Sequence, residues 1–211
     1  MRECTKCRRP VSVRERDMVT GLCPSCRQVE AEEIAEFEAG GRESLRRLSL
    51  AYRHCWSRSG LLSLDDRPWG KYVEPRWYSR DSRVRLFQRR EYRFRTTGFL
   101  HRRYVLVDVK SGQTVRTAES RPSWRILSDA WNVELGVKSA SLSTTGSAAH
   151  YFVRYDNRII ATVHEEASFF RCSTRWCVHG KNDLNDVDLL FIALGCRRSR
   201  GPLLSGNGGG G

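Results

Sequence analysis

The stretch NDLNDVDLLFIALGC, residues 182–196, decides how this chain folds. Seven residues without a polar side chain, Leu189–Gly195, follow an acidic turn and precede Cys196 and three arginines. Together with the acidic residues from Asp186 onward, the segment is about 11 residues long. As an α-helix it spans about 16 Å, roughly half the hydrocarbon core of a bilayer. A helix that is apolar on every side has to be buried on every side. In a chain otherwise made of strands, the inside of a closed barrel is the place that surrounds such a helix.

The composition argues against a membrane-spanning protein. Hydrophobic residues make up 39% of the 211 residues and charged residues 29%. No apolar run reaches the roughly 18 residues that a spanning helix needs. The N-terminal residues MRECTKC lack the apolar segment of a secretory signal. We therefore expect a cytoplasmic protein without a transmembrane segment, which binds a membrane only at its surface if it binds one.

The positive charge is concentrated in one block of the chain. The formal net charge is +13, and residues 51–125 alone carry 18 Lys/Arg against 7 Asp/Glu. Only five of the 37 basic residues are lysine. Arginine grips phosphate oxygens through two parallel hydrogen bonds, so an arginine-rich block suits a phosphate-bearing partner. A GC-rich genome that encodes arginine in place of lysine throughout the chain explains the same bias equally well.

Four cysteines near the N-terminus have the spacing of a zinc site. They are Cys4, Cys7, Cys23 and Cys26. Two CxxC pairs can complete a tetrahedral shell, which predicts a closed structural Zn²⁺ site rather than a redox dithiol or two accidental pairs. A helical pattern follows the second pair directly, which is more typical of a treble clef than of a plain zinc ribbon. We expect residues 1–40 to need Zn²⁺ to fold and to recruit a protein partner.

A second group of possible ligands or nucleophiles lies in FFRCSTRWCVHG, residues 169–180. On a strand, Cys177 and His179 share one face and Cys172 lies on the other. Ordinary strand residues are therefore favoured over a metal site or a Cys–His nucleophile. The other catalytic candidate is the HEE of residues 164–166. Because no glycine loop, nucleophile elbow or HExxH motif accompanies either group, we expect a protein that is not an enzyme.

The segment between the zinc module and the strands, residues 41–75, is expected to be an amphipathic helix and a linker. Apolar residues recur there at intervals of 3, 4 and 4 positions, which predicts a helix over residues 43–57 that docks on the main domain. The stripe consists of Leu45, Leu48, Tyr52 and Trp56. Residues 58–75 are rich in turn signals and are expected to form a linker or a lid.

From about residue 76 the sequence is typical of a β domain. At least nine short segments rich in β-branched and aromatic residues, from RVRLFQRREYRFR at 83–95 onward, are separated by turn signals. The fold class is therefore mainly β, a sandwich or a barrel, over residues 76–198. Residues 199–211 end in SGNGGGG and are expected to be a flexible tail.

Strand alternation places arginines on one face of the early strands. Arg83 and Arg85 point one way and Val84 the other, and Arg93 and Arg95 share a face in the same manner. We predict that guanidinium groups on this rigid sheet form an anion-binding surface, with a solvated outer face as the alternative. The predicted anion-binding residues are Arg83, Arg85, Arg93, Arg95, Arg102, Arg103 and Arg116.

The strand-rich part of the chain resembles the tubby C-terminal-like superfamily, which includes tubby proteins, phospholipid scramblases and plant LURP-one-related proteins. YVLVDVKSGQTVRTAES and HYFVRYDNRIIATVHEE resemble hairpins of the family, SWRILS a following strand, and STRWCVHGKNDLNDVDLLFIALGC the last strand, acidic turn and central helix. The resemblance covers about residues 80–198 and implies a barrel wrapped around a hydrophobic C-terminal helix. The family barrel has twelve strands, so strands beyond the nine are either missing or lie within residues 61–82.

The resemblance implies binding rather than catalysis. Tubby domains hold phosphoinositide head groups through Lys and Arg on the barrel exterior, although no local motif carries particular residues over to this chain. We expect a non-enzymatic, zinc-containing adaptor whose basic barrel binds a phosphoinositide or an anionic phospholipid. The alternative is a regulatory protein that binds nucleic acid, holding phosphates with arginine and stacking bases on aromatic rings. The aromatic candidates are Trp69, Trp77, Tyr78 and Tyr92.

Overall fold

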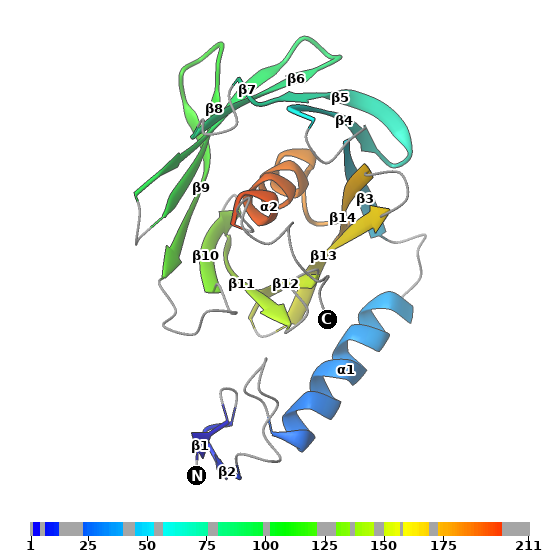
Figure 1. Cartoon of the computed structure of the whole chain (residues 1–211), viewed down its shortest axis with the longest axis vertical. Coiled ribbons are helices and arrows are strands. Elements are labelled where there is room, and N and C mark those ends of the chain that lie inside the picture. Colours follow the sequence, from blue (N-terminus) through cyan, green and yellow to red (C-terminus); the bar gives the residue numbers. More distant parts are fainter. Residues whose placement is uncertain are drawn as a thin grey trace, which may run out of the picture.

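The fold is mainly β, and it is described here from a computed structural model (Figure 1). The residues that the structure describes are 2–4, 7–12, 23–39, 45–52, 57–75, 80–98, 102–121, 130–135, 138–145, 150–156, 158–168 and 173–199. The first strands are β1 (Arg2–Glu3), β2 (Pro10–Val11), β3 (Leu45–Tyr52), β4 (Ser59–Leu64), β5 (Arg67–Val73), β6 (Asp81–Leu86) and β7 (Glu91–Thr97). The later ones are β8 (Arg103–Asp108), β9 (Thr114–Arg121), β10 (Ala130–Leu135), β11 (Lys138–Thr145), β12 (His150–Tyr155), β13 (Arg158–Ser168) and β14 (Ser173–Lys181). The helices are α1 (Pro24–Ala39) and α2 (Asp186–Ser199).

The strands from β3 to β14 form one antiparallel sheet whose order in space follows the order along the chain. Each strand pairs with the next, and β14 pairs with β3, so the described strands close into a barrel (Figure 1). Tight turns set this order. Asp65 and Asp66, which join β4 to β5, both have positive φ, 49° and 61°. A two-residue turn of this kind matches the right-handed twist of the strands on either side.

Helix α2 lies inside the ring of strands (Figure 1). Residues 189–194 are at most 2% exposed. They share one core with inward-facing side chains of β3 to β9 and of β12 to β14. Phe191 packs edge-on against Phe94 of β7, with ring centroids 5.9 Å apart. The mainly β class and the packing of the C-terminal helix on the sheet are thus confirmed, and the helix needs no polar stripe because strands surround it.

The N-terminus of α2 is fixed by hydrogen bonds and ion pairs. The N–H of Asp188 donates to Oδ1 of Asn185 at 2.9 Å, and the N–H of Asn185 donates to Oδ2 of Asp188 at 3.1 Å. This reciprocal arrangement satisfies two backbone N–H groups at the start of the helix. Arg116 of β9 pairs with Asp188, and Arg46 of β3 pairs with Asp186. Negative charge at this end also suits the helix dipole.

Helix α2 ends at the opposite mouth of the barrel, where its last turn carries Arg197 and Arg198. Nη1 of Arg197 lies 3.2 Å from Oε1 of Glu74, and Nη1 of Arg198 lies 3.5 Å from the same oxygen. The hydroxyl of Tyr72 donates to this carboxylate as well, at 2.5 Å. The guanidinium of Arg197 also lies over the ring of Tyr52, 4.5 Å from its centroid. Positive charge at the end of a helix is stabilised by the helix dipole.

Residues 45–52, 59–64 and 67–73 form strands β3, β4 and β5, so the predicted helix over 43–57 and the predicted linker or lid are wrong where the structure describes them. Trp56, the last residue of the predicted stripe, lies outside the described residues. The inward residues of β3 are Leu48, Leu50 and Tyr52, which follow a period of two. Eight residues of β3 pair with β14, and these ladder hydrogen bonds outweigh the helical spacing of the same apolar residues. The barrel therefore begins at Leu45 rather than at residue 76, and strands do lie within residues 61–82.

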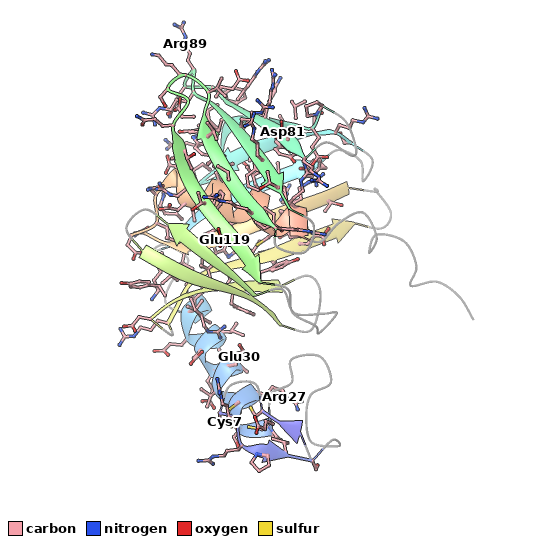
Figure 2. The ribbon with its side chains drawn as sticks, turned by 90° about the vertical axis from the view of Figure 1, so that its left-hand side faces the viewer. Cys7, Arg27, Glu30, Asp81, Arg89 and Glu119 are labelled. Carbon is pink, nitrogen blue, oxygen red and sulfur yellow. The ribbon has the colours of Figure 1, made fainter. Side chains whose placement is uncertain are left out.

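Helix α1 connects the cysteine hairpin to the outer wall of the barrel. Phe37 of α1 packs with Phe152 and Ile159 of β12 and β13. Arg154 of β12 donates through Nη2 to Glu30 at 2.8 Å and to Glu33 at 3.4 Å. The predicted helix after the second CxxC pair is confirmed. The cysteine hairpin consequently lies beyond the barrel, at one end of the molecule (Figures 1 and 2).

Some sequence predictions fall on parts of the chain that the structure does not describe. These are the strand at 123–129, most of the tail at 199–211, and the side chains of Trp77, Tyr78 and Cys172. Ser199 is the exception in the tail, because it ends α2.

Candidate functional sites

The four N-terminal cysteines come together in space. Cys4 and Cys7 belong to the β1–β2 hairpin, which is tightened by a hydrogen bond from the N–H of Arg8 to the carbonyl of Cys4, 3.0 Å. Cys23 precedes α1 and Cys26 lies in its first turn. All four sulfur atoms lie within 4.8 Å of one another. The hairpin therefore supplies one CxxC pair, and the start of α1 with the residue before it supplies the other.

The chemistry of this cluster fits a divalent cation. The N–H of Cys23 points at Sγ of Cys4, 3.3 Å away, and the N–H of Cys26 points at Sγ of Cys23, 3.4 Å away. Such N–H groups stabilise sulfur that carries negative charge. Burial and hydrogen bonds with the other three thiols raise the pKa of Cys26 to about 12. Thiolate is the form of cysteine that binds a metal ion, and a bound cation offsets the repulsion between neighbouring thiolates. Four sulfur donors at this spacing are compatible with tetrahedral Zn²⁺.

The arginines of β6 and β7 face outward, as alternation predicts, but carboxylates accompany most of them. Nε of Arg85 lies 3.4 Å from Glu91, and Asp81 pairs with both Arg93 and Arg95. Arg103 of β8 lies 3.8 Å from Glu119, Arg83 is exposed on the same wall, and Arg102 is half-buried just before β8. The barrel wall is therefore a mixed surface of both signs rather than a bare cradle of guanidinium groups.

Arg116 does not belong to the outer wall, and its prediction as an anion-binding residue is wrong. It lies directly opposite Leu106 in the β8–β9 ladder, in the inward phase of the strand. Its side chain is 13% exposed, and its Nε donates to Oδ1 of Asp188, 6% exposed, at 2.5 Å. The role of Arg116 is to neutralise the start of the central helix.

The β6–β7 turn carries positively charged side chains that are not among the predicted anion-binding residues. Phe87–Arg90 is a turn within the segment 83–95, closed by a hydrogen bond from the N–H of Leu86 to the carbonyl of Arg90 at 2.8 Å. Arg89 has a φ of 63°. The sequence holds a signal for this turn, because the even positions are apolar at 84, 86, 92 and 94 but polar at 88 and 90.

The β8–β9 turn lies beside the β6–β7 turn. The N–H of Val109 donates to the carbonyl of Glu91 at 2.9 Å, which joins the two turns. We call residues 87–90 and 109–112 together the hairpin tip. It carries three basic side chains, those of Arg89, Arg90 and Lys110, and the carboxylate of Asp108 at its base lies near Arg90. Figure 2 places Arg89 at one end of the molecule and Cys7 at the other.

Apolar side chains accompany the charges of the hairpin tip. Phe87 is 57% exposed and Val109 is 50% exposed. Asp108, at the base of the β8–β9 turn, accepts hydrogen bonds from the N–H groups of Lys110 and Ser111 at 2.9 and 3.0 Å. The tip therefore presents a phenyl ring, an isopropyl group and cations on two adjoining turns, and hydrogen bonds hold the backbone of each turn in place.

Two of the aromatic residues considered for base stacking are not accessible. Trp69 and Tyr92 are buried in the core of the barrel. A ring must expose its face to stack on a nucleobase, so neither residue can serve as a stacking platform.

The comparisons with known proteins do not assign a family. No protein-family model, curated protein or solved structure matches this chain. Within the described residues, neither helix is long and apolar enough to span a bilayer. The function therefore has to follow from the cysteine cluster and the hairpin tip.

Proposed function

We propose that this protein is a non-enzymatic adaptor that attaches to an anionic membrane surface through the hairpin tip. The observation that carries the proposal is the exposure of Phe87 and Val109 beside three cationic side chains. Moving an exposed phenyl ring out of water is favourable. Proteins that lie on membranes combine such apolar side chains with Lys and Arg, since the former enter the acyl boundary and the latter meet the anionic head groups.

The expected binding is weak and sensitive to salt. Each of the three basic residues contributes about 1 kcal/mol near an anionic leaflet. Transfer of much of the Phe87 side chain out of water adds about 1–2 kcal/mol. A total of about 4–5 kcal/mol corresponds to a millimolar or slightly tighter affinity, so stable attachment needs a second contact. We propose that the cysteine module, at the other end of the molecule, provides that contact by binding a protein partner.

We also propose that the barrel is of the tubby C-terminal-like type and that the protein is cytoplasmic. The closed antiparallel sheet around a C-terminal helix supports the first proposal, as do the further strands β4 and β5. Members of that superfamily bind phosphoinositides or associate with membrane lipids, which agrees with a lipid surface as the ligand. The phosphoinositide is then one form of the anionic head group that the tip recognises.

The proposal predicts that vesicle binding depends on the hairpin tip. Wild-type protein should sediment with phosphatidylcholine vesicles only when phosphatidylserine or a phosphoinositide is included. The double variant Arg89→Glu and Arg90→Glu changes the local charge by four units, which is expected to lower the partition coefficient on the order of 100-fold or more. Phe87→Ala should lower it about 10-fold, because less apolar surface is buried.

A matched control separates the tip from the overall charge. Arg58→Glu with Arg158→Glu changes the net charge equally, at exposed positions on the opposite mouth and the opposite wall of the barrel. Its binding should fall far less than that of the tip variant. Equal losses in the two double variants, or sedimentation without anionic lipid, would reject the proposed tip. A steep salt dependence for a short oligonucleotide, absent for vesicles, would favour the nucleic-acid alternative.

We propose that the cysteine cluster is a structural Zn²⁺ site, and metal removal tests it. Replacing Cys7 with serine should remove one zinc ion per chain, measured by mass spectrometry of the metal. Residues 1–40 should then become sensitive to protease, since structural Zn²⁺ supplies about 10–16 kcal/mol to small zinc modules. The barrel should keep its unfolding transition, because its core does not include the cysteine cluster. Unchanged zinc content would contradict the assignment.

A further inference from the structure

A second group of metal-ligating side chains lies on the outer wall of the barrel, on β13 and β14. His164 and Cys177 are directly opposite each other in the ladder between these strands. Glu166 follows His164 by two residues and therefore points to the same face. The ligand atoms of the three side chains lie within 4.8 Å of one another. Nε2 of His164 is 3.2 Å from Oε1 of Glu166.

We propose that His164, Glu166 and Cys177 bind a second divalent transition-metal ion, for which Zn²⁺ is the best match. Imidazole, carboxylate and thiolate are the three side-chain ligands that zinc accepts. Bonds of about 2.0–2.3 Å put the ligands of a tetrahedral zinc ion about 3.5 Å apart, so small side-chain rotations suffice to complete the shell. Three protein ligands leave a fourth coordination position for water or another ligand, unlike the closed cysteine cluster.

The neighbouring side chains support an anionic ligand set. Arg47 of β3 donates through Nη2 to Sγ of Cys177 at 4.0 Å. Nη1 of Arg175 lies 3.8 Å from the other oxygen of Glu166. The ring of His179 lies edge-on to that of His164, with centroids 5.1 Å apart. These contacts hold the three ligands in place from outside the shell, as the outer-shell partners of metal sites do.

A cysteine nucleophile is a poorer explanation of the same cluster. Cys177 is 0% exposed, and burial raises the pKa of its thiol despite the nearby guanidinium of Arg47. A buried thiol of this kind is inert toward substrates. A metal ion can still reach it from the side of Glu166, whose carboxylate is exposed. The three metal-ligating side chains are not close together along the chain. Only the register between β13 and β14 brings His164 and Glu166 next to Cys177.

The metal content of the full-length chain tests the proposal. Protein incubated with excess Zn²⁺ and then desalted should retain two ions per chain, measured by mass spectrometry. Glu166→Gln, His164→Gln and Cys177→Ser should each retain one, with affinity at this site lowered by more than about 100-fold, beyond the loss from an outer-shell change. Cys7→Ser should also retain one ion, and combining it with Glu166→Gln should leave none.

A carboxylate elsewhere on the wall provides the matched control. Glu119→Gln removes an exposed carboxylate beside Arg103 and should retain both ions. Because Cys177 is buried, its variant also disturbs packing, so the decisive substitutions are those at Glu166 and His164, with folding checked by circular dichroism. One ion in the wild-type protein, or two ions in both of these variants, would overturn the second site and would leave the cysteine cluster and the hairpin tip unaffected.

Discussion

Replacing Phe191 with alanine is expected to lower the free energy of unfolding by about 3–5 kcal/mol. The side chain lies at the centre of α2, 2% exposed, and packs edge-on against Phe94 of β7. Truncation removes its apolar contacts and leaves a cavity. Strands surround the helix, so the wall on each side is tied by ladder hydrogen bonds and cannot collapse far into the space. Equilibrium unfolding in urea measures the loss.

The control for this prediction is the phenylalanine of the hairpin tip. Phe87→Ala, at an exposed position, should change the free energy of unfolding by less than about 0.5 kcal/mol. Should Phe191→Ala fail to fold, Phe191→Leu keeps most of the volume and is expected to fall between wild type and alanine. A loss below about 1 kcal/mol for Phe191→Ala would mean that the helix is not enclosed.

Replacing Asp188 with alanine is expected to cost about 3–5 kcal/mol. The change leaves the guanidinium of Arg116 buried beside the helix N-terminus without its carboxylate. It also removes the acceptor that caps the N–H of Asn185. Both effects place an uncompensated polar group inside the protein, where water cannot replace the lost partner. The urea midpoint and the slope of the transition measure the effect at constant pH.

A double variant that removes both charges tests the origin of that cost. Arg116→Met combined with Asp188→Asn removes both charges and should be clearly more stable than Asp188→Ala alone, since a buried pair contributes little net stability. Asp186→Asn, which affects the more exposed pair with Arg46, should cost less than about 1 kcal/mol. If Asp188→Ala were as mild as Asp186→Asn, the Arg116 pair would have to be solvated.

The central helix could be predicted from the sequence because its pattern excludes other positions. Residues 189–195 lack the polar stripe of a surface helix and are too few to cross a membrane. The carboxylates before the run and the arginines after it agree with the helix dipole, and both sets of charges lie where this predicts. The cysteine cluster was equally predictable, because its spacing alone brings four sulfur atoms together.

Strands β3 to β5 could not be identified from the sequence in the same way. In Leu45–Tyr52, apolar residues satisfy a helical stripe and a strand alternation at the same time. Pairing with β14, far along the chain, decides between them, and no local pattern reports such pairing. The Asp65-Asp66 turn falls within the predicted linker, although acidic residues adopt its positive φ more readily than most others do.

The candidate sites depended on strand register more than on residue type. The sequence does not report the phase of β9, and a shift by one residue exchanges the two faces, which is why the outer-face prediction for Arg116 is wrong. His164, Glu166 and Cys177 meet only because β13 and β14 pair in one particular register. The hairpin tip was hidden for another reason, since arginine rather than glycine or asparagine takes the positive φ in that turn.

The seam between β3 and β14 has a consequence for how the chain is made. Its two strands are separated by about 130 residues, and α2 follows the second of them. During synthesis the cylinder therefore stays open, with two unpaired edges and an unfilled interior, until β14 and α2 have left the ribosome. Such an edge can pair with other chains. A fragment that ends before α2 should therefore aggregate, because it lacks the helix that fills the barrel.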